Sequence, residues 1–288
     1  MQRSLPSGPT APPDGGRRPY TRPMRAVHEL SEVKAAFRQW PSIAVKGFLW
    51  KHLDLPRREL QIQSRRGTTM VIPLVRNVGA LYGAIEVFAL AQYDYDWKLG
   101  KDPFVVDVGA NIGAWLLWLA ERQPGLSGVC YEPDPAARAF LERNLELNGL
   151  ADKVEIRPEA VSDQTGTAAL YQSEPGEGAS SLYPDSPVVQ FERETTVQTL
   201  SFAEAMKRIG GDVALLKLDC EGAEYRILRG SPPEAWQQVR RVVLEYHPAK
   251  RAEQESMRRR FGELGFSVMQ ERRNAADLGT LWLERGAV

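Results

Sequence analysis

The sequence has little cysteine, and the little it has is widely spaced. Its 288 residues include two cysteines, Cys130 and Cys220, which lie far apart and lack the spacing of a metal site. A reduced cytosolic interior suits this usage better than a disulfide framework. We therefore expect a cytoplasmic protein whose stability comes from a hydrophobic core, for which the chain is long enough.

A net charge and long apolar runs are also missing. Lys plus Arg and Asp plus Glu both number 37, so the net charge is zero. Proteins that bind nucleic acids usually present a basic face, so we expect no nucleic-acid partner. No apolar run approaches the roughly 18 residues needed to cross a bilayer, and the N-terminus shows no apolar segment of a secretory signal. We expect no membrane partner, and the choice between a monomer and a homodimer stays open.

The first hundred residues fall into a tail and a mixed region. Residues 1–23 are rich in Pro, Gly and Arg and poor in apolar side chains, so we expect a disordered tail. In the region 24–100, helical spacing marks residues 27–40 and 77–95, and alternation around an Arg-Gly turn marks residues 59–74 as a hairpin. These patterns predict an N-terminal α+β cap packed on a main domain.

From residue 101 to residue 288 apolar strands alternate with helices. The helix that follows the second strand shows good start and stop signals, with Asp134 before its first residue and Gly149 after its last. A third strand is expected over residues 153–162, and a pair of strands at 265–272 and 279–285 reads as an antiparallel hairpin. Alternating strands and helices predict a doubly wound, Rossmann-like α/β fold, with a parallel sheet covered on both faces.

A glycine turn follows the first of these strands, in the stretch FVVDVGANIGAWLLWLA from Phe104 to Ala120. Ligands of doubly wound folds lie beyond the carboxyl ends of the strands, next to such a turn. In a dinucleotide fold the second glycine lets a pyrophosphate approach the backbone, but Asn111 holds that place here. Asp107 adds a negative charge where phosphates would lie. The turn therefore favours a positively charged ligand without phosphate, such as S-adenosylmethionine.

Glu132 supports this interpretation from the end of the second strand. It lies about 20 residues past the turn, where an acidic residue hydrogen-bonds ribose hydroxyls. The bland alternative is a glycine turn that only permits tight packing. With Glu132 in register, we favour the ligand site.

Four ionisable residues follow two later strands. Asp219 and Glu221 end the strand in VALLKLDCEG, and Glu245 and His247 end the strand in RRVVLEYHP. These strands should be neighbours, so the four groups should converge beside the ligand of the glycine turn, which would be a methyl donor if it is S-adenosylmethionine. Alignment of donor and acceptor lowers the barrier to methyl transfer, and a general base removes the proton of a hydroxyl acceptor. We expect His247 as the base and the three acids as its catalytic neighbours.

Structural roles compete with these catalytic ones. Glu221 could favour the dipole of the next helix, and His247, which precedes Pro248, could be a satisfied loop histidine. Lys217 could pair with Asp219 or lie outside the site. The polar stretch 173–193 could be a lid over the substrate, with Ser180 and Ser181 beside it, or a plain surface loop.

A divalent metal is a further alternative at the same place. Oxygen and imidazole ligands from some of Asp219, Glu221, Glu245 and His247 suit Mg²⁺, Mn²⁺ or a transition metal. No tight ligand spacing requires a metal, so we favour a site without one.

Several motifs together resemble one known family. DVGANIG, YEPDPAARAFLERNLELNGL, AVSDQTGTAALY, GASSLY, LLKLDCEGAEYRILRG and VVLEYHP resemble, in the same order, the FkbM family of S-adenosylmethionine-dependent methyltransferases. The similarity covers about residues 78 to 285. It implies a class I methyltransferase sheet of about seven strands, the last one antiparallel. It also implies methyl transfer to a small-molecule acceptor, usually to an oxygen of a natural product or sugar.

The resemblance also implies which residues bind the cofactor. Those for the methionine part are Asp107, Gly109, Ala110, Asn111 and Gly113; Glu132 and Pro133 lie at the ribose, Ser162 and Asp163 at the adenine, and Asp219 next to the donor. Cys220 departs from the aliphatic residue expected there, and we interpret it as a small buried thiol, not a nucleophile.

Other functions remain open at this point. An N- or carboxyl-methyltransferase would use the same scaffold, and a carboxylate acceptor would need no base. A non-catalytic S-adenosylmethionine-binding protein is a second class, against which the intact Asp107, Glu132, Asp219 and His247 argue. An NAD-dependent oxidoreductase is disfavoured by Asn111. The most favoured function is a small-molecule O-methyltransferase.

Overall fold

The computed structural model describes residues 26–53, 55–75, 78–172, 180–182, 193–249, 251–274 and 278–286. The expected disordered tail at residues 1–23 lies outside them. Within the described part of the chain, no helix combines the length and the apolarity that a membrane crossing requires.

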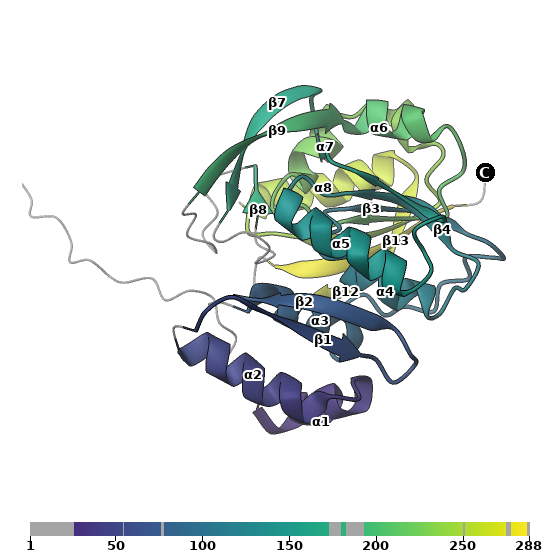
Figure 1. The fold of residues 1–288 in the computed structure, drawn as a ribbon. Coiled ribbons are helices and arrows are strands. Elements are labelled where there is room, and N and C mark those ends of the chain that lie inside the picture. The colour runs from purple at the N-terminus through teal and green to yellow at the C-terminus, as the bar shows by residue number, and fades with distance from the viewer. Residues whose placement is uncertain are drawn as a thin grey trace, which may run out of the picture.

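A seven-stranded sheet forms the centre of the molecule (Figure 1). Its strands are β3 (Phe104–Val108), β4 (Ser127–Tyr131), β5 (Val154–Arg157), β10 (Leu215–Leu218), β11 (Arg241–Tyr246), β12 (Phe266–Arg273) and β13 (Gly279–Arg285). The order is β12-β13-β11-β10-β3-β4-β5, in which β13 runs antiparallel to both of its neighbours and the five strands from β11 to β5 are parallel. The predicted doubly wound sheet with an antiparallel last strand is confirmed.

Successive residues of the central strands point to opposite faces of the sheet, as the strand period of two requires. Val105 joins a core with α4 (Ala114–Ala120) and α5 (Pro135–Leu147). Val106 joins a second core with α6 (Phe202–Ile209), α7 (Glu224–Gly230) and α8 (Arg251–Glu263). Both faces of the sheet are therefore covered, which explains why its strands are nearly continuous apolar runs.

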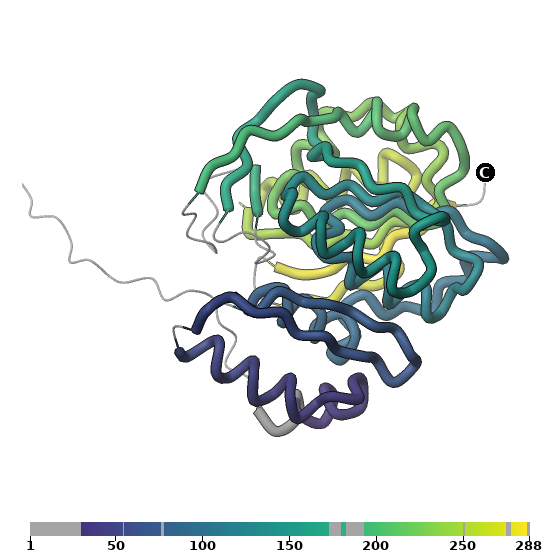
Figure 2. Tube along the Cα trace, in the orientation of Figure 1, coloured from purple at the N-terminus to yellow at the C-terminus, as the bar shows by residue number. Residues whose placement is uncertain are grey.

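The N-terminal region packs on the α4 and α5 side of the molecule (Figure 2). It contains α1 (Ala26–Ala36), α2 (Trp40–His52), β1 (Arg58–Gln63), β2 (Thr69–Leu74) and α3 (Gly79–Phe88). The predicted hairpin is confirmed, because β1 and β2 pair antiparallel. Asn144 of α5 attaches β2, since its side chain accepts from the Val71 N–H at 2.7 Å and donates to the Val71 carbonyl at 3.2 Å. Whether this region is a separate domain stays a prediction.

Two expectations about element boundaries are wrong. The helix expected over 77–95 ends at Phe88, and the buried residues beyond it, which include Tyr93, lie in irregular chain. The single strand expected over 153–162 is two strands, β5 and β6 (Ala160–Ser162), in different sheets. Pro158 lies between them, and proline cannot donate a hydrogen bond to a ladder.

The second sheet has the order β6-β9-β7-β8 and extends away from the central one (Figure 1). Its other strands are β7 (Gly166–Gln172), β8 (Ser180–Ser181) and β9 (Arg193–Ser201). The stretch 173–193, predicted to be irregular, thus begins after β7 and ends at the first residue of β9. Apart from residues 180–182 and 193, it lies outside the described residues.

Candidate active site

The glycine turn brings the ends of β3 and β10 into backbone contact. Gly109 has a φ of +79°, and a Cβ built on it would lie 1.9 Å from the carbonyl oxygen of Asp219. No side chain fits there, so the turn needs a glycine for both conformation and space. This packing role, the bland alternative for the turn, coexists with any role in ligand binding.

Gly113 and Ala110 pack against neighbouring elements and do not line a cavity. Gly113 has a φ of +85°, and a Cβ there would lie 2.6 Å from the Leu141 Cδ1 atom of α5. Ala110 is buried, and its backbone N–H donates to the Tyr131 carbonyl at 3.1 Å. Neither residue lines the cavity described next.

A cavity lies beyond the carboxyl ends of β3, β4 and β10. Its lining residues are Val108, Gly109, Asn111, Tyr131, Glu132, Pro133, Asp134, Ala137, Ala160, Val161, Leu170, Ser180, Leu182, Asp219, Cys220, Glu221 and Ala223. Five of the predicted cofactor-binding residues line it: Gly109, Asn111, Glu132, Pro133 and Asp219. The other five do not: Asp107, Ala110, Gly113, Ser162 and Asp163. The binding roles of all ten stay predictions.

Glu132 is held at the cavity wall by two backbone donors. One carboxylate oxygen accepts from the Asn111 N–H at 2.7 Å, and the other accepts from the Asp134 N–H at 2.9 Å. Burial raises the pKa of Glu132 to about 7, although these two hydrogen bonds act in the opposite direction. Each carboxylate oxygen keeps a second lone pair for a further donor.

Lys217 and two aspartates form a buried cluster of ion pairs next to the glycine turn. The Lys217 ammonium contacts Asp107 Oδ1 at 3.2 Å, Asp219 Oδ2 at 3.3 Å and the Gly109 carbonyl at 3.0 Å. Lys217 therefore pairs with Asp219, which was one of its two predicted positions, and also with Asp107. Burial alone would lower the pKa of Lys217, but the two carboxylates outweigh it and raise that pKa.

The two aspartates respond differently to their surroundings. Burial raises the pKa of Asp107, against the attraction of Lys217, and its Oδ2 atom has no hydrogen-bond partner among the described residues. Burial would also raise the pKa of Asp219, but Lys217 and His247 outweigh it and lower that pKa. Asp219 is therefore an ionised carboxylate at the cavity wall at neutral pH.

The four predicted acid and base residues come together because β10 and β11 are adjacent and parallel. His247 Nε2 lies 3.2 Å from Glu221 Oε2 and 3.8 Å from Asp219 Oδ1. Tyr93 connects Glu245 to this group, because its hydroxyl lies 2.9 Å from Glu245 Oε2 and 2.8 Å from Asp219 Oδ2. Of the four, Asp219 and Glu221 line the cavity, and His247 lies behind Glu221.

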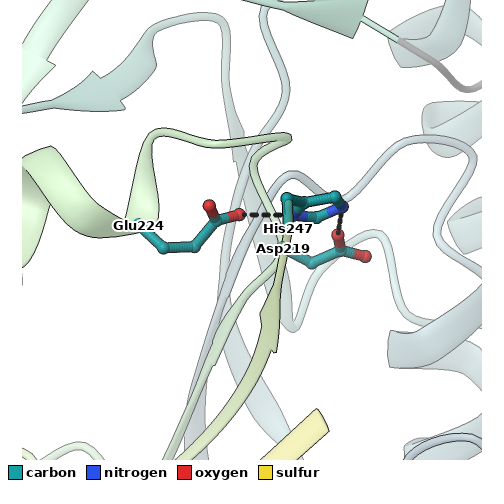
Figure 3. A group of neighbouring side chains, drawn as sticks. All are labelled: Asp219, Glu224 and His247. Atoms are coloured by element: carbon teal, nitrogen blue, oxygen red, sulfur yellow. Dashed lines mark hydrogen bonds and ion pairs between the residues drawn. The ribbon is translucent and has the colours of Figure 1, made fainter. Parts of the chain in front are cut away.

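Glu224, which sequence reasoning missed, organises this group. Its carboxylate accepts from the Cys220 N–H at 2.7 Å and from the Gly222 N–H at 2.9 Å. One of its oxygens also lies 3.2 Å from His247 Nδ1 (Figure 3). Nδ1 therefore faces Glu224, which leaves Nε2 facing Glu221 and Asp219. Glu224 stands in the motif LLKLDCEGAEYRILRG, but nothing in the spacing distinguishes it from an acid on a helix surface.

Glu221 sits in an unusual backbone conformation. Its φ is +53°, the left-handed region that non-glycine residues rarely adopt. The bonds from Glu224 to the residues on either side hold the loop in this shape. Strained residues of this kind cluster at functional sites. Since α7 begins at Glu224, Glu221 lies before the helix in the loop, at the cavity wall.

His247 and Glu221 share protons as a pair. Burial would lower the pKa of His247, but Glu221, Glu224 and Glu245 outweigh it and raise that pKa well above its usual value. Burial raises the pKa of Glu221 to about 7, against the attraction of His247. The imidazole therefore carries a proton at neutral pH, and the pair becomes a proton acceptor as pH rises.

The alternative of a divalent metal can be tested against the positions of the possible ligand atoms. Asp219, Glu224 and His247 each offer one ligand atom within 4.8 Å of the others (Figure 3). Both Glu224 oxygens, however, already accept from backbone N–H groups, and His247 Nδ1 lies within hydrogen-bonding distance of one of them. Protein donors thus account for Glu224 without an ion, and the metal stays an alternative prediction.

Cys220 and Ser180 also line the cavity. Burial raises the pKa of Cys220 well above its usual value, so the group is a thiol and a poor nucleophile at neutral pH. Ser180 lines the cavity, and the Ser181 hydroxyl donates to the Glu221 carbonyl at 2.7 Å. A substrate-binding role for the two serines stays a prediction.

Comparison with known proteins identifies relatives. Residues 107–268 match the family model described as "Methyltransferase FkbM domain". The chain is 31% identical over 189 residues to "Methyltransferase sdnD" of Sordaria araneosa, covering 56% of this chain and 72% of that one. It is 30% identical over 202 residues to "31-O-demethyl-FK506 methyltransferase FkbM" of Streptomyces tacrolimicus, covering 60% of this chain and 76% of that one. A crystal structure of an FkbM methyltransferase from Methylobacillus flagellatus KT aligns with a TM-score of 0.44 at 15% identity, covering 70% of this chain and 53% of that one.

Proposed function

The chain belongs to the FkbM family of S-adenosylmethionine-dependent methyltransferases, and on that premise we propose that it methylates a hydroxyl oxygen of a small molecule. The name of one relative, a methyltransferase for 31-O-demethyl-FK506, supports an oxygen acceptor on a natural product. The observation that carries the proposal is the placement of Asp219 and Glu221 at the cavity wall, with His247 3.2 Å behind Glu221.

The cavity beyond β3 and β4 suits the donor. Asn111 lines the cavity, and its Oδ1 atom is a buried oxygen with no hydrogen-bond partner among the described residues. Asp107 Oδ2 is a second such oxygen, although Asp107 does not line the cavity. Unpaired buried acceptors are costly, so they favour a ligand that brings donors, such as the ammonium of the methionine part. Glu132 keeps lone pairs for two ribose hydroxyls. These groups lie around the end of β3, at the switch point where doubly wound folds bind ligands.

The acceptor would lie on the Asp219 and Glu221 side. When bound, the donor supplies a methyl carbon that is already activated on a sulfonium. The acceptor oxygen forms a bond to that carbon as the carbon–sulfur bond breaks, and the electron pair of that bond goes to sulfur. The residues of the chain therefore have two tasks, which are to align the hydroxyl and to take its proton.

The proton passes to the Glu221–His247 pair. Glu221 lines the cavity and accepts the proton, which passes on to Nε2 of the deprotonated His247, so that Glu221 is again a carboxylate beside an imidazolium. Glu224 fixes the imidazole through Nδ1, as a carboxylate does in catalytic triads. In this arrangement the general base is the pair, whereas the sequence predicted His247 alone.

The acidic wall argues against a carboxylate acceptor. Asp219 is ionised and Glu221 becomes so near neutral pH, and like charges within a few Å repel in a buried site. A neutral hydroxyl avoids this repulsion and can donate its hydrogen to either oxygen. Hydroxyl and amine acceptors therefore remain the chemical choices, and the family relative favours the hydroxyl.

The proposal is tested with labelled S-adenosylmethionine and matched acceptors. One natural-product or sugar skeleton is supplied in three forms, bearing a hydroxyl, an amine or a carboxylic acid at the same position. We expect label in the hydroxyl form, and chemical analysis should place it on oxygen. Label only on the amine or acid would show a different acceptor class. No label on any acceptor, with intact donor binding by calorimetry, would support a non-catalytic protein.

A further inference from the structure

The segment between α3 and β3 reaches into the acid and base group. It contains Gln92 and Tyr93, which are 8% and 3% exposed. Both residues lie outside the stretch 107–268 that matches the family model. The segment is anchored by Arg272, which donates to the Ala91 carbonyl at 2.7 Å, and by Trp282, which donates to the Tyr93 carbonyl at 3.4 Å. The Tyr93 ring is therefore held in place through its backbone.

The Tyr93 hydroxyl bridges two carboxyl groups that come from different strands. It lies 2.8 Å from Asp219 Oδ2, at the end of β10, and 2.9 Å from Glu245 Oε2, on β11. The Gln92 amide donates to the same Glu245 oxygen. The Lys217 ammonium lies 3.3 Å from the same Asp219 oxygen. Both carboxyl groups are thus approached by donors at the oxygen that faces Tyr93.

A count of protons assigns the direction of these bonds. A tyrosine hydroxyl has one hydrogen, so it cannot donate to two ionised carboxylates at once. Both contacts become hydrogen bonds if Glu245 carries a proton and donates it to the Tyr93 oxygen, while Tyr93 donates to Asp219. Burial and the nearby Asp219 raise the pKa of Glu245 to about 8, in agreement with that assignment. The pKa of Tyr93 is raised well above its usual value by burial and by both acids, so its hydroxyl stays protonated.

We propose that Tyr93 is a positioning residue of the acceptor site, which receives a hydrogen bond from neutral Glu245 and donates one to Asp219. The contact occupies Asp219 Oδ2, and the other oxygen, Oδ1, faces His247 Nε2 at 3.8 Å. The orientation of Asp219 at the cavity wall therefore depends on a residue from the N-terminal region. This proposal rests on the proposed function, because the acceptor site is what Asp219 serves.

Other charged groups also act on the two carboxyls. Asp219 interacts with Lys217 and His247, and Glu245 interacts with His247 and with Glu86 of α3. All of these groups remain when Tyr93 is replaced by phenylalanine, which keeps the ring and removes only the hydroxyl. The variant therefore removes the two hydrogen bonds of the hydroxyl, to Asp219 and to Glu245, and leaves the charged groups in place.

The test compares Tyr93→Phe with the matched control Tyr95→Phe. Tyr95 is two residues away and packs its ring on Trp97 and Trp282, but has no described contact with the acids. Carboxyl ¹³C NMR of the full chain follows the titration of Asp219, whose signal is assigned with Asp219→Asn. We expect the Asp219 midpoint to rise by about one to two pH units in Tyr93→Phe, the effect of one lost hydrogen bond to a charged group, and to stay unchanged in Tyr95→Phe. An unchanged midpoint in a Tyr93→Phe protein that binds donor normally would overturn the proposal.

Kinetics with an identified acceptor complete the test. We expect Tyr93→Phe to lower kcat by tenfold or more and to leave the donor affinity within twofold of wild type. Equal kcat in the two tyrosine variants would refute a positioning role even if the Asp219 midpoint moved. The NMR measurement needs no acceptor, so it tests the hydrogen bond from Tyr93 to Asp219 separately from the reaction. If the Asp219 midpoint shifts but the protein methylates no hydroxyl, the proposed function is contradicted while the hydrogen bond is supported.

Discussion

Replacement of Glu224 by glutamine should damage both the stability and the acid-base behaviour of the site. The Glu224 carboxylate is fully buried and accepts from the Cys220 N–H and the Gly222 N–H. A glutamine keeps the shape but turns one acceptor into an NH₂ group, so one backbone N–H would face another donor. His247 would also lose, at Nδ1, an acidic partner that raises its pKa.

The magnitude follows from the bonds that are lost. A buried donor left without an acceptor costs about 1–3 kcal/mol, and the remaining bond weakens because charge-assisted hydrogen bonds are roughly twice as strong as neutral ones. We expect a loss of about 3 kcal/mol in the free energy of unfolding. With an unfolding entropy of about 2.1 cal/mol/K per residue, a chain of 288 residues would then melt about 5 °C lower.

The assay is urea unfolding together with NMR of the histidine rings. The chain has three histidines, so the imidazole signals of His247 are simple to assign. Its midpoint should fall in Glu224→Gln, because Glu224 is one of the acids that raise its pKa. Glu255→Gln is the matched control. Glu255 is 61% exposed and pairs with Arg251 on the surface of α8, where such pairs contribute little.

The reasoning is refuted if Glu224→Gln unfolds within about 0.5 kcal/mol of Glu255→Gln and the His247 midpoint does not move. A loss of stability alone, with an unchanged midpoint, would show that Glu224 supports only the loop. In that case the orientation of the imidazole would need another cause.

Three further predictions concern the donor and the alternative metal. Gly109→Ala should lose donor affinity and much more stability than Gly149→Ala, which has a similar positive φ of +64° but no atom within 4 Å of the added Cβ; equal losses would contradict the close approach to Asp219. Donor binding near pH 7 should release a proton from Glu132, whose pKa of about 7 falls when ribose hydroxyls donate to it; calorimetry in two buffers of different ionisation enthalpy measures this, and Glu132→Gln should abolish it. Finally, a chelator should leave methyl transfer intact, whereas loss of activity that Mg²⁺ or Mn²⁺ restores would establish a metal mechanism.

The fold was largely predictable because its signals are local. Apolar strands alternate with helices, and cap residues such as Asp134, whose side chain accepts from the Ala136 N–H, mark helix starts. The errors arose where tertiary contacts override local pattern. The apolar residues after Phe88 look like a continued helix, but they lie in irregular chain and pack into the core with Val243 and Trp282 of the central sheet. Pro158 was present in the sequence, yet the strand on its far side joined a different sheet.

The site was predictable to the extent that strand ends identify it. Asp219, Glu221, Glu245 and His247 follow two adjacent parallel strands, so their meeting needed only the strand order. Tyr93 could not be found this way, because the spacing of residues 77–95 predicted a helix there and because Tyr93 lies 126 residues before Asp219 in the chain. The protonation states of the four acid and base residues also depend on burial and on the distances between carboxyl groups, which sequence spacing does not give.

The pH dependence of methyl transfer to a hydroxyl acceptor tests the central claim most directly. The active form of the Glu221–His247 pair is the deprotonated one, and both pKa values are raised, so turnover should rise with pH through the neutral range and above it. His247→Gln should lower turnover by roughly 10²–10⁴-fold with donor affinity nearly unchanged, and the surface variant Glu255→Gln should match wild type. Full activity in His247→Gln, with a flat pH profile and no effect of a chelator, would contradict the account and leave alignment of the reactants as the source of catalysis.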